Sequence, residues 1–178
     1  LFNGVGGGAA ALISVIEYLE VGGEDTLALT ATVFTVVVGS VGTGGGSRPT
    51  NRAVVLRGGE VVAHYDKHHL PNYGVFDEAR IFVPGEEPAV VDVDGVRVGL
   101  AICEDIWREG GTVEQLAEHG VDLLLVINGS PYEEGKTHTR YDLAVRRAAE
   151  VGAPVIYVNQ VGGQDDLVFD GGSFVVDR

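Results

Sequence analysis

Residues 123–159 read LLLVINGSPYEEGKTHTRYDLAVRRAAEVGAPVIYVN, and this stretch decides the fold class of the chain. The apolar run Leu123–Ile127 is typical of a strand that is buried on both faces. A helical pattern over Thr137–Val151 follows it, and Val155–Asn159 is a second apolar strand. Two strands joined through a helix lie parallel in one sheet, so this order predicts an α/β fold.

Both predicted helices carry local signals. The helix Thr137–Val151 ends before Gly152 and is amphipathic, with one stripe that holds Tyr141, Ala144, Val145, Ala148 and Ala149. A shorter helix, Val113–His119, follows Thr112 and has Glu114 in its first turn, where the helix dipole favours negative charge.

Outside this stretch the chain is rich in short β-type runs separated by turn residues. The predicted strands are Val33–Gly39, Arg52–Leu56, Glu60–Tyr65, Ala89–Val93, Val96–Ile102 and Ser173–Val176. Gly58–Gly59 and Asp94–Gly95 each separate two of these runs and predict hairpins, so we expect mixed sheets. The segment Ala9–Glu20 fits either a helix or a strand.

Length, charge and cysteine usage narrow the class of protein. The 178 residues are enough for one domain, and the formal net charge of −14 argues against a nucleic-acid partner. No apolar run reaches the roughly 18 residues that cross a bilayer, so we expect no membrane insertion. A single cysteine forms no internal disulfide, which favours a cytoplasmic protein. Since the sequence has no methionine, we expect it to be incomplete, at the N-terminus in particular.

The single cysteine, Cys103, lies in VGLAICEDIW (residues 98–107). A lone cysteine is more often a small apolar side chain of the core. This one ends a strand, where open α/β sheets gather their functional groups. The adjacent acids Glu104 and Asp105 disfavour the thiolate, so a reactive Cys103 requires a nearby cation or a general base.

A polar, aromatic segment, YDKHHLPNYGVFDEARIFVPG (residues 65–85), is typical of a binding loop held by a scaffold. Lys67 directly follows a predicted strand and is a candidate for the missing cation, the alternative being a solvated surface charge. His68 and His69 have no third ligand at a suitable spacing, so we predict no metal site.

Two more strands run into polar residues at the same level of the sheet. Leu123–Ile127 leads into NGSPY (residues 128–132), and Val155–Asn159 leads into QVGGQDDLVF (residues 160–169), which we interpret as a loop. The carboxyl ends of parallel strands share one edge, so these residues are predicted to lie near Cys103.

Four strings in this order, YDKHHLPNYGVFDEARIFVPG, AICEDIW, INGSPYEEGK and YVNQVGGQDDLVFDGGSFVVD, resemble the glutaminase domain of glutamine-dependent NAD synthetases. These domains belong to the nitrilase, or carbon–nitrogen hydrolase, superfamily. The resemblance covers residues 36–178 and implies an αββα four-layer sandwich with mixed sheets. It also implies that residues 1–178 form part of a single glutaminase domain, without the ATP-dependent synthetase domain.

The same resemblance implies a Glu–Lys–Cys triad. Cys103 matches the nucleophile, and Lys67 matches the cation that stabilises the tetrahedral intermediate, together with the backbone N–H of Glu104. Tyr73 and Ser130 match residues that contact the glutamine substrate, and Glu78 matches an acid beside the lysine and cysteine.

The triad glutamate is not fixed by the sequence, because the early segment that carries it in the family is missing here. Glu17, Glu20 and Glu24 are the candidates, and Glu20 in Tyr18–Leu19–Glu20 is our choice since it comes closest to a strand end that carries an acid.

The activity implied is hydrolysis of the L-glutamine side-chain amide, which supplies ammonia for ATP-dependent amidation of deamido-NAD. No cofactor is expected within these residues, ATP and Mg²⁺ being implied for the synthetase domain, and a homo-oligomer is implied for the whole enzyme. The alternatives are a stand-alone amidase for another small amide and a non-catalytic structural domain that has lost its general base.

Overall fold

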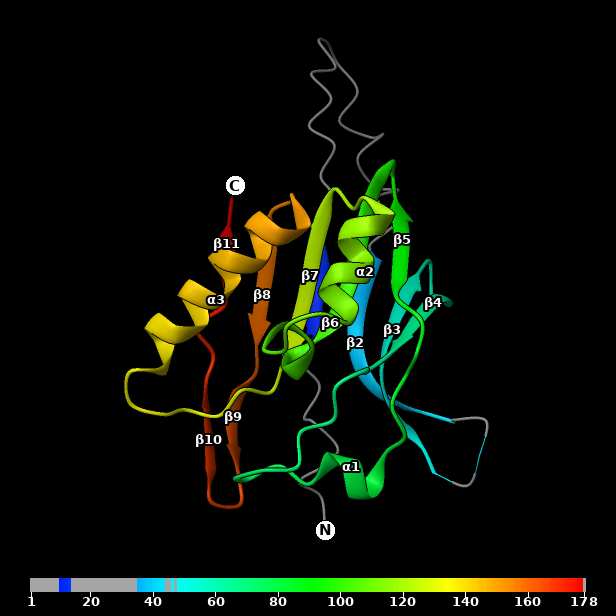
Figure 1. Cartoon of the computed structure of the whole chain (residues 1–178). Coiled ribbons are helices and arrows are strands. Elements are labelled where there is room, and N and C mark those ends of the chain that lie inside the picture. Colours follow the sequence, from blue (N-terminus) through cyan, green and yellow to red (C-terminus); the bar gives the residue numbers. More distant parts are fainter. Residues whose placement is uncertain (1–9, 14–34, 44–45, 47, 178) are drawn as a thin grey trace, which may run out of the picture.

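The structure, a computed structural model, describes residues 10–13, 35–43, 46 and 48–177. Two sheets form most of this part of the chain (Figure 1). The first, sheet A, has the order β1-β2-β3-β4 with every pair antiparallel, and its strands are Ala10–Ile13, Thr35–Gly42, Thr50–Arg57 and Glu60–Asp66. The strand β1 confirms the strand alternative for the part of Ala9–Glu20 that the structure describes.

The second sheet, sheet B, is mixed, as the sequence predicts. Its order is β11-β8-β7-β6-β5, and its strands in chain order are Ala89–Val93, Val96–Ile102, Leu123–Asn128, Val155–Asn159 and Phe174–Val176. The three central strands β6, β7 and β8 are parallel, and the outer strands β5 and β11 are antiparallel to their neighbours. The turns at Gly58–Gly59 and Asp94–Gly95 form the two predicted hairpins.

Four helices lie within the described residues: α1 (Glu78–Ile81), the 3₁₀ turn η2 (Cys103–Ile106), α2 (Thr112–His119) and α3 (Lys136–Val151). Figure 1 shows α2 and α3 on one face of sheet B, with β1 and β2 of sheet A behind the other face. None of the helices in this part of the chain is long and apolar enough to cross a membrane.

Two apolar cores hold these layers together. One lies between the sheets and combines Val37 and Val55 of sheet A with Leu100 and Leu125 of sheet B. The other lies between sheet B and the helices and includes Leu116 of α2. The described residues therefore form three layers of the predicted αββα sandwich, in the order sheet, sheet and helix.

The predicted apolar stripe of α3 matches its buried face only at Ala144 and Ala148. Tyr141, Val145 and Ala149 are exposed, whereas the residues buried against sheet B are Arg140, Leu143, Ala144, Arg147, Ala148 and Val151. Two arginines lie on the buried face because their guanidinium groups donate to backbone carbonyls of neighbouring loops. A pattern based on apolar residues alone therefore misplaces this face by about one residue.

The segment after β8 is not the predicted loop. It forms a two-stranded hairpin, β9 (Val161–Gln164) paired with β10 (Leu167–Asp170), which extends beyond the end of β8 (Figure 1). Glycines at positions 162 and 163 lower the strand propensity of this segment, which explains why the sequence pattern missed it. The glycine tract at residues 44–47 lies largely outside the described residues.

Candidate active site

Cys103 lies where β6 ends and η2 begins, as the sequence predicts. Its backbone has a φ of 45°, in the left-handed region that residues other than glycine rarely adopt. Such a conformation costs about 1–3 kcal/mol and occurs mostly at functional sites. The turn redirects the chain immediately after the strand, so the thiol is held by the core on one side and by the turn on the other.

Lys67 lies in the first turn after β4, and it is paired rather than solvated. Its Nζ donates to both carboxylate oxygens of Glu78, at 2.8 and 2.9 Å. Asn51 Nδ2 also donates to Glu78 Oε2, at 3.1 Å. Lys67 is only 1% exposed and Glu78 only 8%. Charges are buried to this degree only when they are paired, and loss of either partner costs several kcal/mol.

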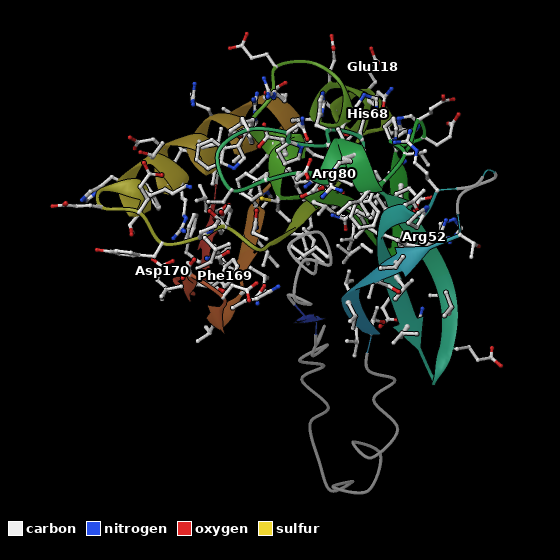
Figure 2. All side chains as sticks on the ribbon, turned by 90° about the horizontal axis from the view of Figure 1, so that it is seen from below. Arg52, His68, Arg80, Glu118, Phe169 and Asp170 are labelled. Atoms are coloured by element: carbon white, nitrogen blue, oxygen red, sulfur yellow. The ribbon has the colours of Figure 1, made fainter. Side chains whose placement is uncertain are left out.

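The lysine and the cysteine meet in one small cavity of about 60 Å³, which we call the inner cavity. Its polar lining comes from segments that are far apart in the sequence: Asn51, Lys67, Glu78, Cys103, Asn128, Gln160 and Gln164. The hairpin strand β10 closes one side with Leu167 and Phe169. In Figure 2, Phe169 and Arg52 of sheet A lie toward opposite sides of the molecule. The cavity is lined from sheet A by Gly39 and Asn51, from sheet B by Ile102 and Ile127, and from the hairpin by Leu167 and Phe169.

The thiol lies in surroundings that oppose its ionisation. Burial raises the pKa of Cys103, and the carboxylates of Glu78, Glu104 and Asp105 raise it further, whereas the positive charge of Lys67 lowers it. The requirement inferred from the sequence, a cation beside the thiol, is therefore met by Lys67.

Asp105 ties the loop of Lys67 to the turn of Cys103. Its carboxylate is completely buried and accepts from the hydroxyl of Tyr65 at 2.8 Å and from the backbone N–H of His69 at 2.8 Å. It also accepts from the N–H of Ile102 at 2.9 Å. Burial beside this carboxylate raises the pKa of Tyr65 well above its usual value, so the hydroxyl stays protonated and keeps donating.

On its other side Cys103 lines a wider pocket of about 500 Å³, which we call the outer pocket. Its lining residues are Tyr73, Phe76, Cys103, Glu104, Trp107, Ser130, Glu133, Glu134, Gly135, Lys136 and Thr139. The Tyr73 hydroxyl donates to Glu104 at 2.8 Å. Partial burial, followed by the nearby Glu104 carboxylate, raises the pKa of Tyr73 to about 12.

Ser130 is held in place by its neighbours. Its backbone N–H donates to Asn159 Oδ1 at 2.9 Å, and its hydroxyl accepts from Arg140 Nε at 3.2 Å. Arg140 also forms an ion pair with Asp170 at 2.9 Å, so one buried guanidinium connects α3, the turn after β7 and the strand β10.

The structure thus brings together six of the seven residues singled out from the sequence. Cys103, Lys67 and Glu78 line the inner cavity, and Tyr73, Ser130 and Glu104 line the outer pocket with Cys103. Glu20 and the other candidate bases lie outside the described residues. Within the described part of the chain, no group of histidine, cysteine and acidic residues is arranged to hold a metal ion.

Sequence reasoning did not single out four polar residues of the inner cavity, Asn51, Asn128, Gln160 and Gln164. Asn128, Gln160 and Gln164 belong to the two polar segments that the sequence predicts near Cys103, and Asn128 and Gln160 lie at or directly after the ends of the parallel strands β7 and β8. Asn51 lies near the start of β3, an inner strand of the antiparallel sheet A, and has no comparable signal.

The geometry agrees with a comparison against protein-family models, in which residues 26–178 match the carbon-nitrogen hydrolase family. The chain belongs to the carbon–nitrogen hydrolase family. This membership confirms the predicted fold class and the resemblance on which it was based.

Individual relatives within this family are glutamine-dependent NAD synthetases. The enzyme of Acinetobacter baylyi is 46% identical over 128 residues, which are 72% of this chain and 24% of that protein. The enzyme of Xanthomonas campestris is 46% identical over 158 residues, or 86% of this chain and 28% of that protein. The chain therefore spans about a quarter of the length of the curated relatives it matches.

Solved structures of other carbon–nitrogen hydrolases superpose on the chain. Glutamine-dependent NAD⁺ synthetase from Acinetobacter baumannii, solved with ADP, has a TM-score of 0.75 and 46% identity, covering 79% of this chain and 27% of that one. An amidase of the nitrilase superfamily from Nesterenkonia has a TM-score of 0.66 and 33% identity, covering 78% of this chain and 52% of that one.

Proposed function

We propose that this carbon–nitrogen hydrolase removes ammonia from the side-chain amide of L-glutamine through a Glu–Lys–Cys triad. The observation that carries the proposal is the shared inner cavity, where the only thiol of the chain faces a buried lysine. One of the Nesterenkonia amidase structures is described as showing covalent addition at its active-site cysteine. That precedent supports a nucleophilic role for Cys103 here.

In the first step the sulfur of Cys103 attacks the amide carbon, and the carbonyl oxygen becomes an oxyanion. The Lys67 ammonium and the backbone N–H of Glu104 stabilise this oxyanion. Glu104 is the second residue of η2, and N–H groups in the first turn of a helix have no acceptor within it. An early glutamate, for which Glu20 is our choice, accepts the thiol proton.

Collapse of the oxyanion breaks the C–N bond. The nitrogen keeps the bonding electron pair, takes the proton from the glutamate and leaves as ammonia, while the acyl group stays on sulfur as a thioester. Water then attacks the thioester carbon, and the glutamate accepts a proton from the water and passes it to the sulfur, which leaves as a thiol. The products are glutamate and ammonia, and the enzyme returns to its starting state.

The outer pocket favours an amino acid over a simple amide. Glu104 and Glu134 offer negative charge to an α-ammonium group, and Lys136, which also forms an ion pair with Glu133 at 3.3 Å, offers positive charge to an α-carboxylate. The pocket also borders Cys103, so a substrate whose head lies there can extend its side-chain amide to the thiol. A stand-alone amidase for uncharged amides does not require charged side chains in this pocket.

We further propose that the ammonia serves ATP-dependent amidation of deamido-NAD, as the names of the relatives suggest. ATP and Mg²⁺ then act in a synthetase domain that is not part of these 178 residues, and residues 1–178 belong to the glutaminase domain. The whole enzyme is expected to be a homo-oligomer in which this domain supplies the ammonia.

A glutaminase assay on the purified protein and on Cys103→Ala tests the proposal. We expect the wild type to release ammonia from L-glutamine and the variant to lose activity by at least about 1000-fold, because a missing nucleophile removes the covalent route. A diazo-ketone analogue of glutamine should label the wild type, and the only site labelled should be Cys103.

Two outcomes contradict the proposal in different ways. Equal ammonia release by the wild type and Cys103→Ala excludes the mechanism, whereas a wild type that prefers butyramide to L-glutamine indicates an amidase. The third possibility, a non-catalytic domain, predicts neither turnover nor labelling. Thermal unfolding of both proteins shows whether the substitution has left the fold intact.

A further inference from the structure

Two buried oxygen atoms at the inner cavity have no hydrogen-bond partner within the described part of the chain. They are the side-chain carbonyl oxygens Asn128 Oδ1 and Gln160 Oε1, and both residues line the cavity together with Cys103 and Lys67. Asn128 is 1% exposed. Buried oxygens that accept no hydrogen bond are uncommon in folded proteins, so each requires an explanation.

The orientation of the Asn128 amide is fixed by its nitrogen. Nδ2 donates to the backbone carbonyls of Val126 and Val158, at 3.0 Å in each case. A flipped amide would turn its oxygen toward these two carbonyl oxygens, which also only accept. The oxygen of Asn128 therefore lies on the side away from the backbone of β7 and β8.

Gln160 lies beside Asn128 on the neighbouring strand end. Its backbone N–H donates to the carbonyl oxygen of Asn128 at 2.9 Å, which sets the spacing of the two residues. Its Oε1 passes close to Gly129, since a β-carbon at that position would lie 3.4 Å from this oxygen. Glycine between the two residues thus leaves room for the side chain of Gln160.

Two acceptors in one cavity call for a ligand group with two N–H or O–H donors. A metal ion or an organic cation is disfavoured, because the ammonium of Lys67 occupies the same cavity and the Glu78 carboxylate is already paired with it. The NH₂ end of a primary carboxamide has two N–H donors and no net charge. Its size is also compatible with a cavity of about 60 Å³.

We propose that Asn128 Oδ1 and Gln160 Oε1 bind the two N–H groups of the substrate carboxamide and hold the nitrogen while it leaves as ammonia. This inference rests on the proposed hydrolysis. It orients the amide so that its nitrogen faces the acceptor pair and its oxygen faces Lys67. When the C–N bond breaks, the nitrogen keeps the bonding pair and gains the thiol proton by way of the glutamate, so its two original N–H bonds stay on the acceptors.

The acceptor pair selects for primary amides. An ester has no N–H for the two oxygens, and a secondary amide has one N–H and a substituent that meets Asn128 or Gln160. Sites built to hydrogen-bond a polar group discriminate strongly against analogues without it, because their own buried atoms are then left without partners.

The test compares L-glutamine with the γ-methyl ester of L-glutamate, which forms the same thioester but releases methanol. Gln160→Met keeps the length of the side chain and removes the acceptor. We expect kcat/KM for glutamine to fall about 10-fold or more, with a decrease in kcat. We expect kcat/KM for the ester to change less than about 2-fold. Gln160→Glu keeps an acceptor, so the ratio of kcat/KM for glutamine to kcat/KM for the ester should stay within about 3-fold of the wild-type ratio.

Gln115→Met on α2 is the matched control, because Gln115 lines neither the inner cavity nor the outer pocket. This substitution should leave kcat/KM unchanged for both substrates. Asn128 is not the test residue because its Nδ2 joins β7 and β8, so its replacement also weakens the sheet. Thermal unfolding confirms that each variant is folded.

The outcomes separate this inference from the proposed function. Suppose that the wild type hydrolyses glutamine through Cys103. If Gln160→Met then lowers kcat/KM equally for both substrates, or for neither of them, the acceptor pair is wrong and the proposed function stands. A wild type that cleaves neither substrate overturns the proposed function and the acceptor pair with it.

Discussion

At the level of single residues, the reactivity of Cys103 is set by two opposed effects. Burial and three carboxylates raise the pKa of the thiol, and the ammonium of Lys67 lowers it. Burial is the largest of these, so the neutral thiol is the main form of the resting protein at neutral pH. A mechanism that starts from this state needs a base to remove the proton during the attack, which is the role we assign to the early glutamate.

This balance predicts the pH dependence of alkylation. A raised pKa means that the reactive thiolate appears only at high pH, so the rate of labelling by iodoacetamide should rise to a midpoint above the value of about 8.5 for a free cysteine. Lys67→Met removes the positive charge and should move the midpoint to still higher pH. Mass spectrometry between about pH 6 and pH 10 measures both rates, and the single cysteine makes every label unambiguous.

Lys136→Met is the control for this experiment. Lys136 lines the outer pocket with Cys103, but it is not among the groups that shift the pKa of the thiol. Its replacement should leave the midpoint unchanged. A wild-type midpoint below that of free cysteine, or equal shifts in the two lysine variants, would show that Lys67 does not act on the thiol.

At the level of elements, the loop between β4 and β5 is packed against itself at Gly85. The N–H of Gly85 donates to the carbonyl oxygen of Lys67 at 2.9 Å. A β-carbon at this position would lie 2.1 Å from the carbonyl oxygen of Asp66, closer than any real contact. The returning chain therefore reaches the strand end that carries Lys67 only because residue 85 has no side chain.

We expect Gly85→Ala to lower the free energy of unfolding by about 2 kcal/mol, since the backbone must move to admit one methyl group. Because the shift displaces Lys67, glutaminase activity should fall as well. Gly46→Ala is the matched control, as no atom of the described residues lies within 4 Å of a β-carbon there. Urea unfolding measures the stability of both variants, and a similar small effect in both would contradict the close packing.

How much the sequence could predict also differs between elements. The strands of sheet B and the position of Cys103 were predictable, because apolar runs and turn residues depend on local chemistry. The buried face of α3 was not, since Arg140 and Arg147 are buried through hydrogen bonds to carbonyls from distant loops. The segments of Asn128 and Gln160 were predicted to lie near Cys103, but their role as acceptors was not predictable, because it depends on a cavity that several elements form together.

At the level of the whole molecule, the acidic surface sets a limit on stability. The chain has 26 acidic and 12 basic residues. Two of the basic residues, Lys67 and Arg140, are buried in ion pairs with Glu78 and Asp170 and screen little of the surface. Repulsion between the remaining carboxylates disfavours the compact state at low ionic strength.

Salt should therefore stabilise the protein, although it weakens exposed ion pairs such as Arg80–Asp77. Such pairs contribute less than about 1 kcal/mol each, and the acidic residues outnumber the basic ones by more than two to one. Raising the ionic strength from about 0.01 M to about 0.15 M shortens the screening length from about 30 Å to about 8 Å. We expect a gain of about 1 kcal/mol, which is about 2–4 °C in Tm for a domain of this size.

A pair of substitutions identifies the cause of this salt effect. Glu86 and Glu87 are adjacent and exposed, so Glu86→Gln with Glu87→Gln removes two negative charges without disturbing the core. This variant should have a higher Tm than the wild type in low salt and a smaller gain on adding salt. Glu86→Asp with Glu87→Asp keeps the charge and should behave like the wild type. If Tm falls with salt in all three proteins, favourable ion pairs outweigh the repulsion and the acidic surface does not limit stability.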